Sequence, residues 1–332
     1  MTEAKRESLA VTYDLDCTNW IKGIAILMVI LSHLPGGPPT GGWGVELFLL
    51  CSGYGLARSY IRKGQLTGYW TSKWKKVWLP YAIVTGTVIL LDSVVFSKRY
   101  APVTCLLAVL GLDTHATVDC TMWYIPYLLC CYVIFYGAFR CFGAQPKKAI
   151  AVLTAGIGVL TVASFFVFDR SSGAWNYFTA YPAGVIAAYA ADRFFWSGKT
   201  KTYLLIAGWC TLAAGILLLA GLDLQTMHMA LRKVLRLMTD LLLSVGTILL
   251  APFFTKRRVL AKWKLVGMIS YELYLLEEVM ITRGGSLWHR WDAMPVNLAA
   301  YFVMLFGMAI IVNRGIKRLS VKQNIGKLRE RI

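Results

Sequence analysis

A series of apolar runs, each close to the length of a membrane-spanning helix, follows the 332-residue chain from near its start to near its end. A helix needs about 20 residues to cross the hydrocarbon core of a bilayer. Ten such runs use most of the chain and leave no room for a large soluble catalytic domain. The composition agrees, because 57% of the residues are hydrophobic and only 16% are charged, too few to coat a soluble globule of this size. The sequence therefore predicts an all-α, polytopic membrane helix bundle.

The predicted spans are drawn from the apolar runs themselves. They cover residues 20–34, 43–61, 77–96, 122–142, 149–168, 175–191, 203–222, 231–254, 265–282 and 295–312. The run 102–112 is too short to span and is followed by polar residues, so we interpret it as interfacial or re-entrant. The chain is then one membrane domain, with an N-terminal segment 1–19, a transmembrane bundle 20–312 and a basic tail 313–332.

The positions of the basic residues predict the orientation. With the N-terminus inside, 27 of the 35 Lys and Arg residues fall in cytoplasmic segments. Lys and Arg near span ends resist translocation, so ten spans with both termini cytoplasmic are expected, in the cell membrane. The formal net charge of +18 comes in short clusters between apolar runs, which favours anionic lipids as partners and not nucleic acid. The eight cysteines lack paired CxxC spacing and a neighbouring His, so we expect no metal.

Ionisable residues inside spans are costly and mark candidate functional sites. Lys22 and His33 lie eleven residues apart on the first span. At about 100° per residue they return to within roughly 20° of one face, three turns and about 16.5 Å apart. Glu46 follows on the second span, and the short Pro/Gly-rich loop 35–44 is expected to hold it at about the depth of His33. A carboxylate that accepts the Nδ1 proton of His33 would make the imidazole a better general base.

The segments WIKGIAILMVILSHL and GVELFLLCSGYGLARSY resemble the opening of the acyltransferase 3 family of integral-membrane O-acyltransferases. In that family a basic residue, usually Arg, is separated from an essential His by ten intervening residues, and a V-D/E-L-F-F-x-x-S-G-F/Y stretch follows. The matching positions here are Lys22, His33, Glu46 and the Ser-Gly-aromatic step that contains Ser52 and Tyr54.

Three later stretches extend the resemblance over nearly the whole chain. SKWKKVWLPY is similar to the family's basic cytoplasmic turn, Trp123 begins a Trp-aromatic-Leu-like step, and ISYELYLLEEV is similar to a Ser-Tyr-x-x-Tyr-Leu motif. Two positions depart from the pattern: Lys22 replaces the commoner Arg, and Glu277 stands where many members carry a His.

The resemblance implies transfer of an acyl group, usually acetyl, from cytoplasmic acyl-CoA to a hydroxyl of an extracytoplasmic glycan or related acceptor. His33 and Glu46 would be catalytic, and Ser52, Tyr54 and Trp123 would bind substrate or support the site. Lys22 would bind a CoA phosphate, and so would the lysines of the basic turn, which are Lys73, Lys75 and Lys76. The pantetheine arm is about as long as three helical turns, so it could join a nucleotide at Lys22 to a thioester at His33.

Several alternatives stay open at this point. Direct transfer and a covalent acyl-histidine need the same residues. A membrane exporter of a glycan or lipid-linked intermediate, or an inactive sensing module, would also use ten spans and buried charges. On the eighth span, Arg232, Arg236 and Asp240 are spaced by four residues and share a face, which predicts an internal ion pair. The acceptor and the acyl chain length are not determined by the sequence.

Overall fold

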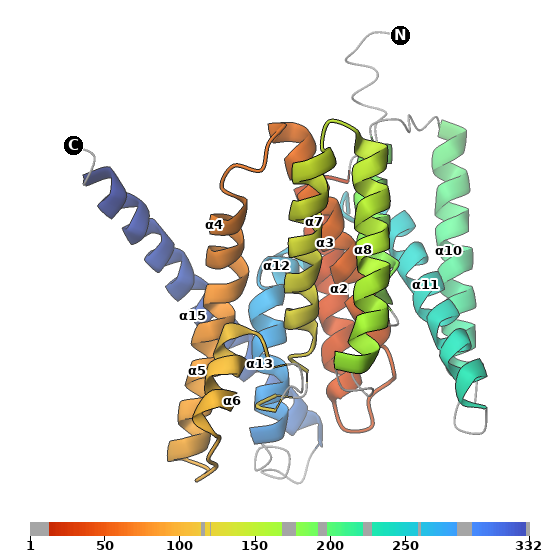
Figure 1. Cartoon of the computed structure of the whole chain (residues 1–332). Coiled ribbons are helices and arrows are strands. Elements are labelled where there is room, and N and C mark those ends of the chain that lie inside the picture. The colour runs from red at the N-terminus through yellow and green to blue at the C-terminus, as the bar shows by residue number, and fades with distance from the viewer. Residues whose placement is uncertain are drawn as a thin grey trace. The chain divides into compact units, whose positions relative to one another are not determined.

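The structure is a computed structural model that describes residues 13–113, 117–119, 121–167, 177–191, 198–221, 228–257, 260–283 and 294–329. The regular elements in these ranges are all helices, and they include no strand (Figure 1). The all-α prediction is therefore confirmed. Most of the predicted N-terminal segment, and the first residues of the predicted span 175–191, lie outside the described residues.

The described helices, in chain order, are α2 (Leu15–His33), α3 (Gly41–Lys63), α4 (Tyr69–Lys73), the π-helical turn η1 (Trp74–Trp78), α5 (Leu79–Val94), α6 (Pro102–Leu110), α7 (Tyr124–Phe142), α8 (Pro146–Val167), α9 (Ala180–Ala190), α10 (Gly198–Gly221), α11 (Met229–Phe254), the 3₁₀ turn η3 (Leu260–Lys262), α12 (Trp263–Met268), α13 (Ser270–Arg283) and α15 (Met294–Arg329). Helix α15 continues from the last predicted span into the predicted basic tail.

Seven of the described helical segments are long and apolar enough to cross a membrane. They are α2, α4 through α5, α7, α8, α10, α11 and α15. The other three predicted spans correspond to α3, to α9, and to α12 with α13. Helix α3 is continuous, but Glu46, Arg58 and several glycines make it less apolar. Helix α9 has 11 residues, and the segment 265–282 is divided at Ile269. Ten crossings stay a prediction.

Helix α6 has the short, non-spanning form that its sequence predicts. Its nine residues end at Gly111, whose φ of 72° is left-handed and stops the helix. Side chains of the preceding segment satisfy its last carbonyls: Tyr81 donates to the oxygen of Ala108 at 2.6 Å, and Trp78 donates to that of Leu110 at 3.2 Å. The helix is thereby tied back to α5.

The basic turn before α5 contains a π-helical stretch, η1. Pro80 follows this stretch by two residues, and proline has no amide hydrogen for the carbonyl one turn earlier. Widening the helix is a common way to accommodate that loss. The indole rings of Trp74 and Trp78 stack across the turn, with their centroids 3.8 Å apart.

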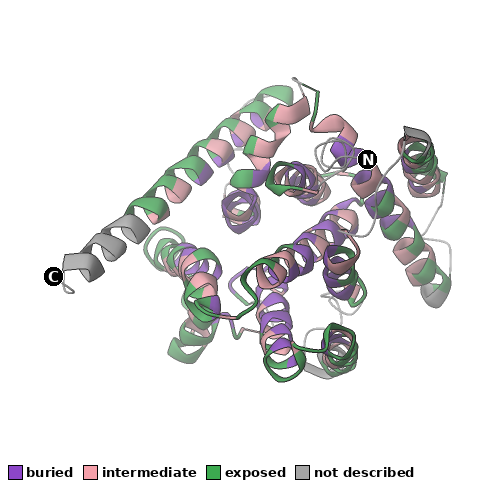
Figure 2. Cartoon of the chain, turned by 90° about the horizontal axis from the view of Figure 1, so that it is seen from above, coloured by how far each residue is buried: buried purple, intermediate pink, exposed green. Residues whose placement is uncertain are grey.

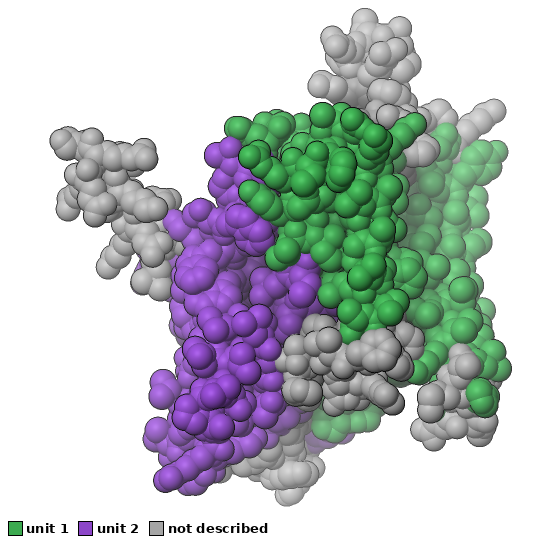
Figure 3. All heavy atoms as spheres, viewed as in Figure 1, with its two compact units in different colours: residues 1–65, 131–163, 173–270 green, residues 66–130, 164–172, 271–332 purple. Residues whose placement is uncertain are grey.

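The chain forms two compact units (Figure 3). Unit 1 comprises residues 1–65, 131–163 and 173–270, and unit 2 comprises residues 66–130, 164–172 and 271–332. Unit 1 therefore holds α2, α3, most of α8, α9 to α12 and the larger part of α7. Unit 2 holds α4 to α6, the first two turns of α7, nearly all of α13, and α15.

Glycines set the close packing of α10 on α11 in unit 1. A side chain at Gly215 would meet Leu243 at 2.7 Å, and one at Gly208 would meet Leu250 at 2.9 Å. As one helix advances the other recedes, so the two helices are antiparallel. Small residues that let helix backbones approach closely are typical of contacts inside membranes.

Helices α3 and α11 run in the same direction. Asp240 approaches Gly42, and one turn later on both helices Ser244 bonds Glu46. Parallel helices need an odd number of membrane crossings between them. If α5, α7, α8 and α10 each cross once, then either α6 or the α9 segment crosses as well. The short, tied-back α6 favours the α9 segment, and this supports the predicted alternation of spans.

Some helices have one buried and one exposed side, and others are exposed along most of their length (Figure 2). In α10 only 11% of the most apolar window is buried, and in α15 only 22%. Their exposed residues include Leu217 and Ile311, which are 71% and 70% exposed. Apolar faces of this extent would be unfavourable in water, and lipid removes that cost.

Candidate active site

Helix α2 carries both Lys22 and His33 without interruption. It begins five residues before the predicted span, because the side chain of Asp14 caps it by accepting a first-turn amide hydrogen bond at 2.8 Å. It ends at His33, because Leu34 takes the extended conformation required before Pro35. Both Lys22 and His33 are half-buried. The predicted placement of the two residues on a single continuous helix therefore agrees with the structure.

The loop that follows His33 folds back along α2. The hydroxyl of Thr40 donates to the carbonyl oxygen of Met28 at 2.8 Å, and the Gly37 amide donates to Leu34 at 2.8 Å. Gly37 has no room for a side chain, because the Leu31 carbonyl occupies that position. Helix α3 consequently begins beside the last turns of α2, where a side chain at Gly41 would meet that of Ser32.

The register of α3 on α2 gives the position of Glu46 along the bundle. Gly44 packs so closely on α2 that a side chain there would lie 2.4 Å from the Ala25 oxygen and 2.7 Å from Val29. Glu46 is two residues further down α3, which places it about 10 Å below His33 along the helix axis at 1.5 Å per residue. This offset is measured along the backbone, and the two side chains lean toward one another because side chains tilt toward the N-terminus of their own helix. A contact between Glu46 and His33 stays a prediction.

Glu46 joins α3 to α11. Its Oε2 accepts a hydrogen bond from the Ser244 hydroxyl at 3.1 Å, and the residue is 7% exposed. One turn away, the Trp43 indole donates to the Thr247 hydroxyl at 3.1 Å. A buried carboxylate needs such partners, and these fix the contact between the two parallel helices.

The predicted ion pair on α11 is confirmed, and it has a further contact that was not predicted. Arg236 lies 3.7 Å from the carboxylate of Asp240, which is 2% exposed. The guanidinium also donates to the carbonyl oxygen of Pro39 in the loop after His33. Arg232, the third residue of this face, is half-buried one turn away. The bond between Arg236 and Pro39 could not be predicted from a sequence pattern, because the two residues are far apart in the chain.

The Ser-Gly-aromatic step packs α3 against its neighbours. A side chain at Gly53 would lie 2.2 Å from the carbonyl oxygen of Tyr181 in α9, so only glycine fits there. Tyr54 is buried and donates its hydroxyl to the Tyr13 oxygen at 3.0 Å. Ser52 is half-buried beside them. The geometry of Gly53 and Tyr54 is that of supporting residues.

A cavity of about 200 Å³ lies beside Tyr54 in unit 1. Residues of α2, α3, α9 and α11 line it, Cys51 among them. The Tyr13 hydroxyl donates to the Ile248 oxygen at 2.8 Å, and burial raises the pKa of this phenol, so it stays a neutral donor. Both tyrosine hydroxyls are thus used on backbone carbonyls, which leaves the cavity wall largely apolar.

The basic turn belongs to unit 2. Lys73 and Lys75 are half-buried and Lys76 is exposed. The turn is held by Tyr271 of α13, whose hydroxyl donates to the Val77 oxygen at 2.8 Å. Lys22 belongs to unit 1, so a shared phosphate site of Lys22 and these lysines stays a prediction.

Trp123 lies at the start of α7, also in unit 2. It is half-buried, and its ring centroid is 6.2 Å from that of Tyr124. Tyr124 in turn meets Tyr274 of α13 edge to face at 5.5 Å, and the Tyr274 hydroxyl donates to the Thr121 oxygen at 2.6 Å. The three later sequence motifs therefore meet through the tyrosines of α13.

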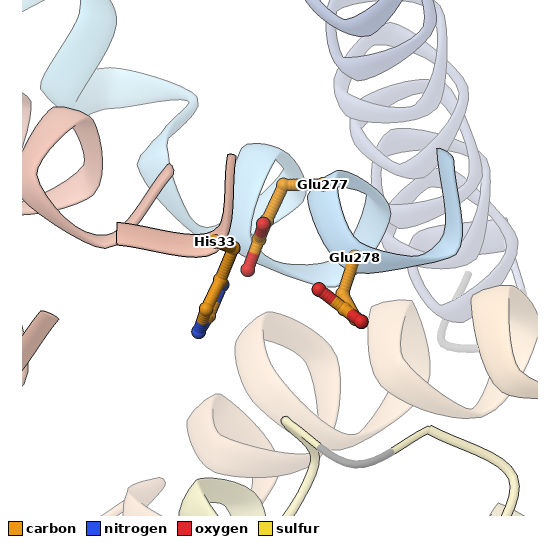
Figure 4. A group of neighbouring side chains, drawn as sticks. All are labelled: His33, Glu277 and Glu278. Atoms are coloured by element: carbon orange, nitrogen blue, oxygen red, sulfur yellow. The ribbon is translucent and has the colours of Figure 1, made fainter. Parts of the chain in front are cut away.

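The acidic residues of α13 have different surroundings. Glu272 accepts a hydrogen bond from the Asn313 amide of α15 at 2.7 Å. Glu277 is fully buried and Glu278 is 8% exposed. Figure 4 draws these two neighbouring side chains on α13 and His33 in the last turn of α2. His33 belongs to unit 1 and the two glutamates belong to unit 2.

Comparison with protein families identifies the chain. The model of the acyltransferase domain of the acyltransferase 3 family matches residues 15–313, from the first turn of α2 into α15. The chain belongs to the acyltransferase 3 family. Searches of curated proteins and of solved structures found no match. Family membership and the seven apolar helices make this chain a multi-pass membrane acyltransferase.

The family match contains every candidate site residue named above. It also gives a common setting to motifs that lie far apart in the sequence. The opening motifs form α2 and α3 of unit 1, and the later motifs pack on one another in unit 2. Lys22 and Glu277 remain the two departures from the usual residues of the acyltransferase 3 family.

Proposed function

We propose that this membrane acyltransferase transfers an acyl group, acetyl in the simplest case, from cytoplasmic acyl-CoA to a hydroxyl of an extracytoplasmic glycan or related acceptor in the cell envelope. The observation that carries the proposal is the single helix α2, which holds a cation two turns from its start and an imidazole in its last turn. That arrangement suits a donor whose phosphates and thioester are separated by an extended arm.

His33 is the general base of the proposed reaction. An imidazole nitrogen removes the proton of the acceptor hydroxyl as its oxygen attacks the thioester carbonyl. The carbon–sulfur bond then breaks, and the CoA thiolate takes the proton from the imidazolium. The ester remains on the acceptor, and the imidazole is neutral again.

Lys22 is the proposed contact for a phosphate of the donor. Its ammonium is a compact charge that can bind one phosphate, whereas the guanidinium found in most family members could bind it through two parallel hydrogen bonds. Lys73, Lys75 and Lys76 are further candidates for phosphate contacts, since they are clustered in the turn before α5.

We propose that Glu46 supports the position of α3, whereas its place in the sequence suggests that it orients His33. Its hydrogen bond to Ser244 holds α3 against α11, beneath the loop that follows His33. We infer that Glu46 affects the reaction through the position of α3. We propose the same indirect role, support of the helices that hold the site, for Ser52, Tyr54 and Trp123.

The test is an acyl-transfer assay on purified protein in lipid nanodiscs with a hydroxyl acceptor present. Turnover is measured as the rate at which free CoA thiol is released. His33→Ala should lower turnover by about 10²-fold or more, the usual contribution of a general base. His228→Ala is the matched control, because it removes an exposed histidine outside α2 and should leave turnover unchanged. A correctly inserted His33→Ala protein with the turnover of the control would refute the proposal.

A further inference from the structure

We propose that Arg236 is a positioning residue for the reaction: it holds the loop that follows His33, and Asp240 holds Arg236. The inference rests on the proposed role of His33. It concerns a different element, α11, and a contact that the chemistry above does not use.

The loop is attached to the rest of unit 1 at two places. At its end, the Thr40 hydroxyl binds the Met28 carbonyl of α2 at 2.8 Å. At the residue before Thr40, the carbonyl oxygen of Pro39 accepts a hydrogen bond from the guanidinium of Arg236. Arg236 is the described side chain that ties the loop to α11.

Asp240 is built into the start of α3. The hydroxyl of Thr40, the residue before α3, is used on α2 and gives α3 no side-chain cap. The carboxylate of Asp240 fills the place that a side chain at Gly42 would take, 2.1 Å from the carbon that would be added. The first turn of a helix carries partial positive charge, so α3 stabilises this buried carboxylate on one side and Arg236 stabilises it on the other.

The pair therefore orients the guanidinium before it reaches the loop. Arg236 is 29% exposed in its side chain and would otherwise have many rotamers. Bound to a fixed carboxylate, it presents its remaining N–H groups to Pro39. The end of the loop is then held at Pro39 by α11 and at Thr40 by α2, and this restricts the short segment that connects it to His33.

A small displacement of His33 is enough to affect turnover. Misplacing a reacting group by about 1 Å can cost about 10²-fold in rate. Loss of the Arg236 contact should therefore lower kcat by about 10- to 100-fold and change the KM for the acyl donor by less than about twofold, since Lys22 lies about three turns from His33 on α2.

The first experiment measures the loop itself. A nitroxide is attached at Pro38→Cys, an exposed loop position, after the exposed Cys141 and Cys210 are replaced by serine. Its mobility is compared between the parent protein, Arg236→Ala and Arg232→Ala. Arg232→Ala is the matched control, because it removes a cation from the same helix face one turn away. Arg236→Ala should mobilise the label and the control should not.

The second experiment measures kcat and KM for acyl-CoA in the same variants, with Arg236→Lys and Asp240→Asn added. Arg236→Lys keeps a donor and should recover part of kcat. Asp240→Asn should reduce kcat, because the guanidinium loses its anchor. If a variant inserts poorly, the lysine and asparagine variants still test the contact, because they preserve size.

The outcomes separate this proposal from the proposed function. An immobile label in Arg236→Ala overturns the loop contact, whatever the activity. A mobile label with unchanged kcat overturns the positioning of His33. An active His33→Ala protein refutes the proposed function, while the label experiment still decides whether Arg236 holds the loop.

Discussion

The ion pair of Arg283 and Asp92 in unit 2 is expected to carry an unusual share of the stability of the protein. The guanidinium makes two hydrogen bonds to the Asp92 carboxylate at 2.6 and 2.7 Å, and a third to the Val118 carbonyl at 2.8 Å. The Tyr100 hydroxyl also donates to the Asp92 carboxylate at 2.5 Å. The side chains of Arg283 and Asp92 are only 13% and 1% exposed. The pair thus joins α5, α13 and a connecting segment.

The magnitude follows from what remains after Arg283→Ala. Asp92 would keep one hydroxyl donor and lose its counter-charge while still buried, and breaking a buried pair in this way costs about 3–5 kcal/mol. The chain offers an internal control, Lys264 with Asp16, at 2.6 Å but with side chains 37% and 53% exposed. An exposed pair is worth up to about 1 kcal/mol. The two substitutions should therefore differ by several-fold in cost.

Unfolding of the purified protein by denaturant, in one detergent, would measure both variants. Arg283→Ala should lower the free energy of unfolding by about 3–5 kcal/mol and Lys264→Ala by less than about 1 kcal/mol. The double variant Arg283→Gln with Asp92→Asn should recover much of the loss, because no charge is left buried. Equal losses for Arg283→Ala and Lys264→Ala would refute the reasoning.

Three further predictions follow from unit 1. Lys22→Ala should raise the KM for acyl-CoA with little change in kcat, and Lys22→Arg should stay within about twofold of the parent, in steady-state titrations; an unchanged KM in Lys22→Ala would place the donor phosphate elsewhere. Gly53→Ala should cost about 1–3 kcal/mol in thermal unfolding, because its added carbon meets the Tyr181 carbonyl, whereas Gly55→Ala, which faces open space, should be neutral or stabilising. A membrane-impermeant thiol reagent should label Pro38→Cys in intact cells if the loop is external, and labelling only after permeabilisation would reverse the predicted topology.

Local sequence signals predicted the helices, and long-range contacts account for the differences. The end of α6 could be expected from Gly111, a residue suited to a left-handed helix cap. The division of the segment 265–282 could not. There, Gly267 packs against the backbone of Asn19 in α2, where an added carbon would lie 1.7 Å from the carbonyl oxygen. That contact between distant residues fixes the end of α12 and leaves Ile269 outside the helix.

The candidate site also contains relations that local spacing predicts and relations that depend on long-range contacts. Lys22 and His33 lie on one helix, so the helical period was enough to relate them. Relating Glu46 to His33 needed the path of the loop between two helices. That path depends on the bonds of Thr40 to α2 and of Arg236 to the loop, and neither is encoded in the spacing of the residues they join.

The tyrosines of the sequence motifs share one kind of contact, and it indicates that they stabilise the fold and do not take part in the reaction. Their hydroxyls donate to backbone carbonyls of other segments: Tyr54 to Tyr13, Tyr81 to Ala108, Tyr271 to Val77 and Tyr274 to Thr121. A backbone carbonyl that is buried or faces lipid needs a hydrogen-bond donor, because no water is there to supply one. A tyrosine can meet that need while its ring packs among apolar side chains.

Replacement of these tyrosines by phenylalanine should therefore weaken the fold and leave substrate affinity unchanged. Each lost bond should cost about 1 kcal/mol or more in unfolding, because the carbonyl that remains is buried. Thermal unfolding and the KM for acyl-CoA, measured on Tyr271→Phe and Tyr274→Phe, would test this. A raised KM with unchanged stability would mean that the hydroxyl contacts the donor. The opposite result is expected for His33, the ionisable side chain in the last turn of α2. Its removal should stop turnover in a protein that remains folded.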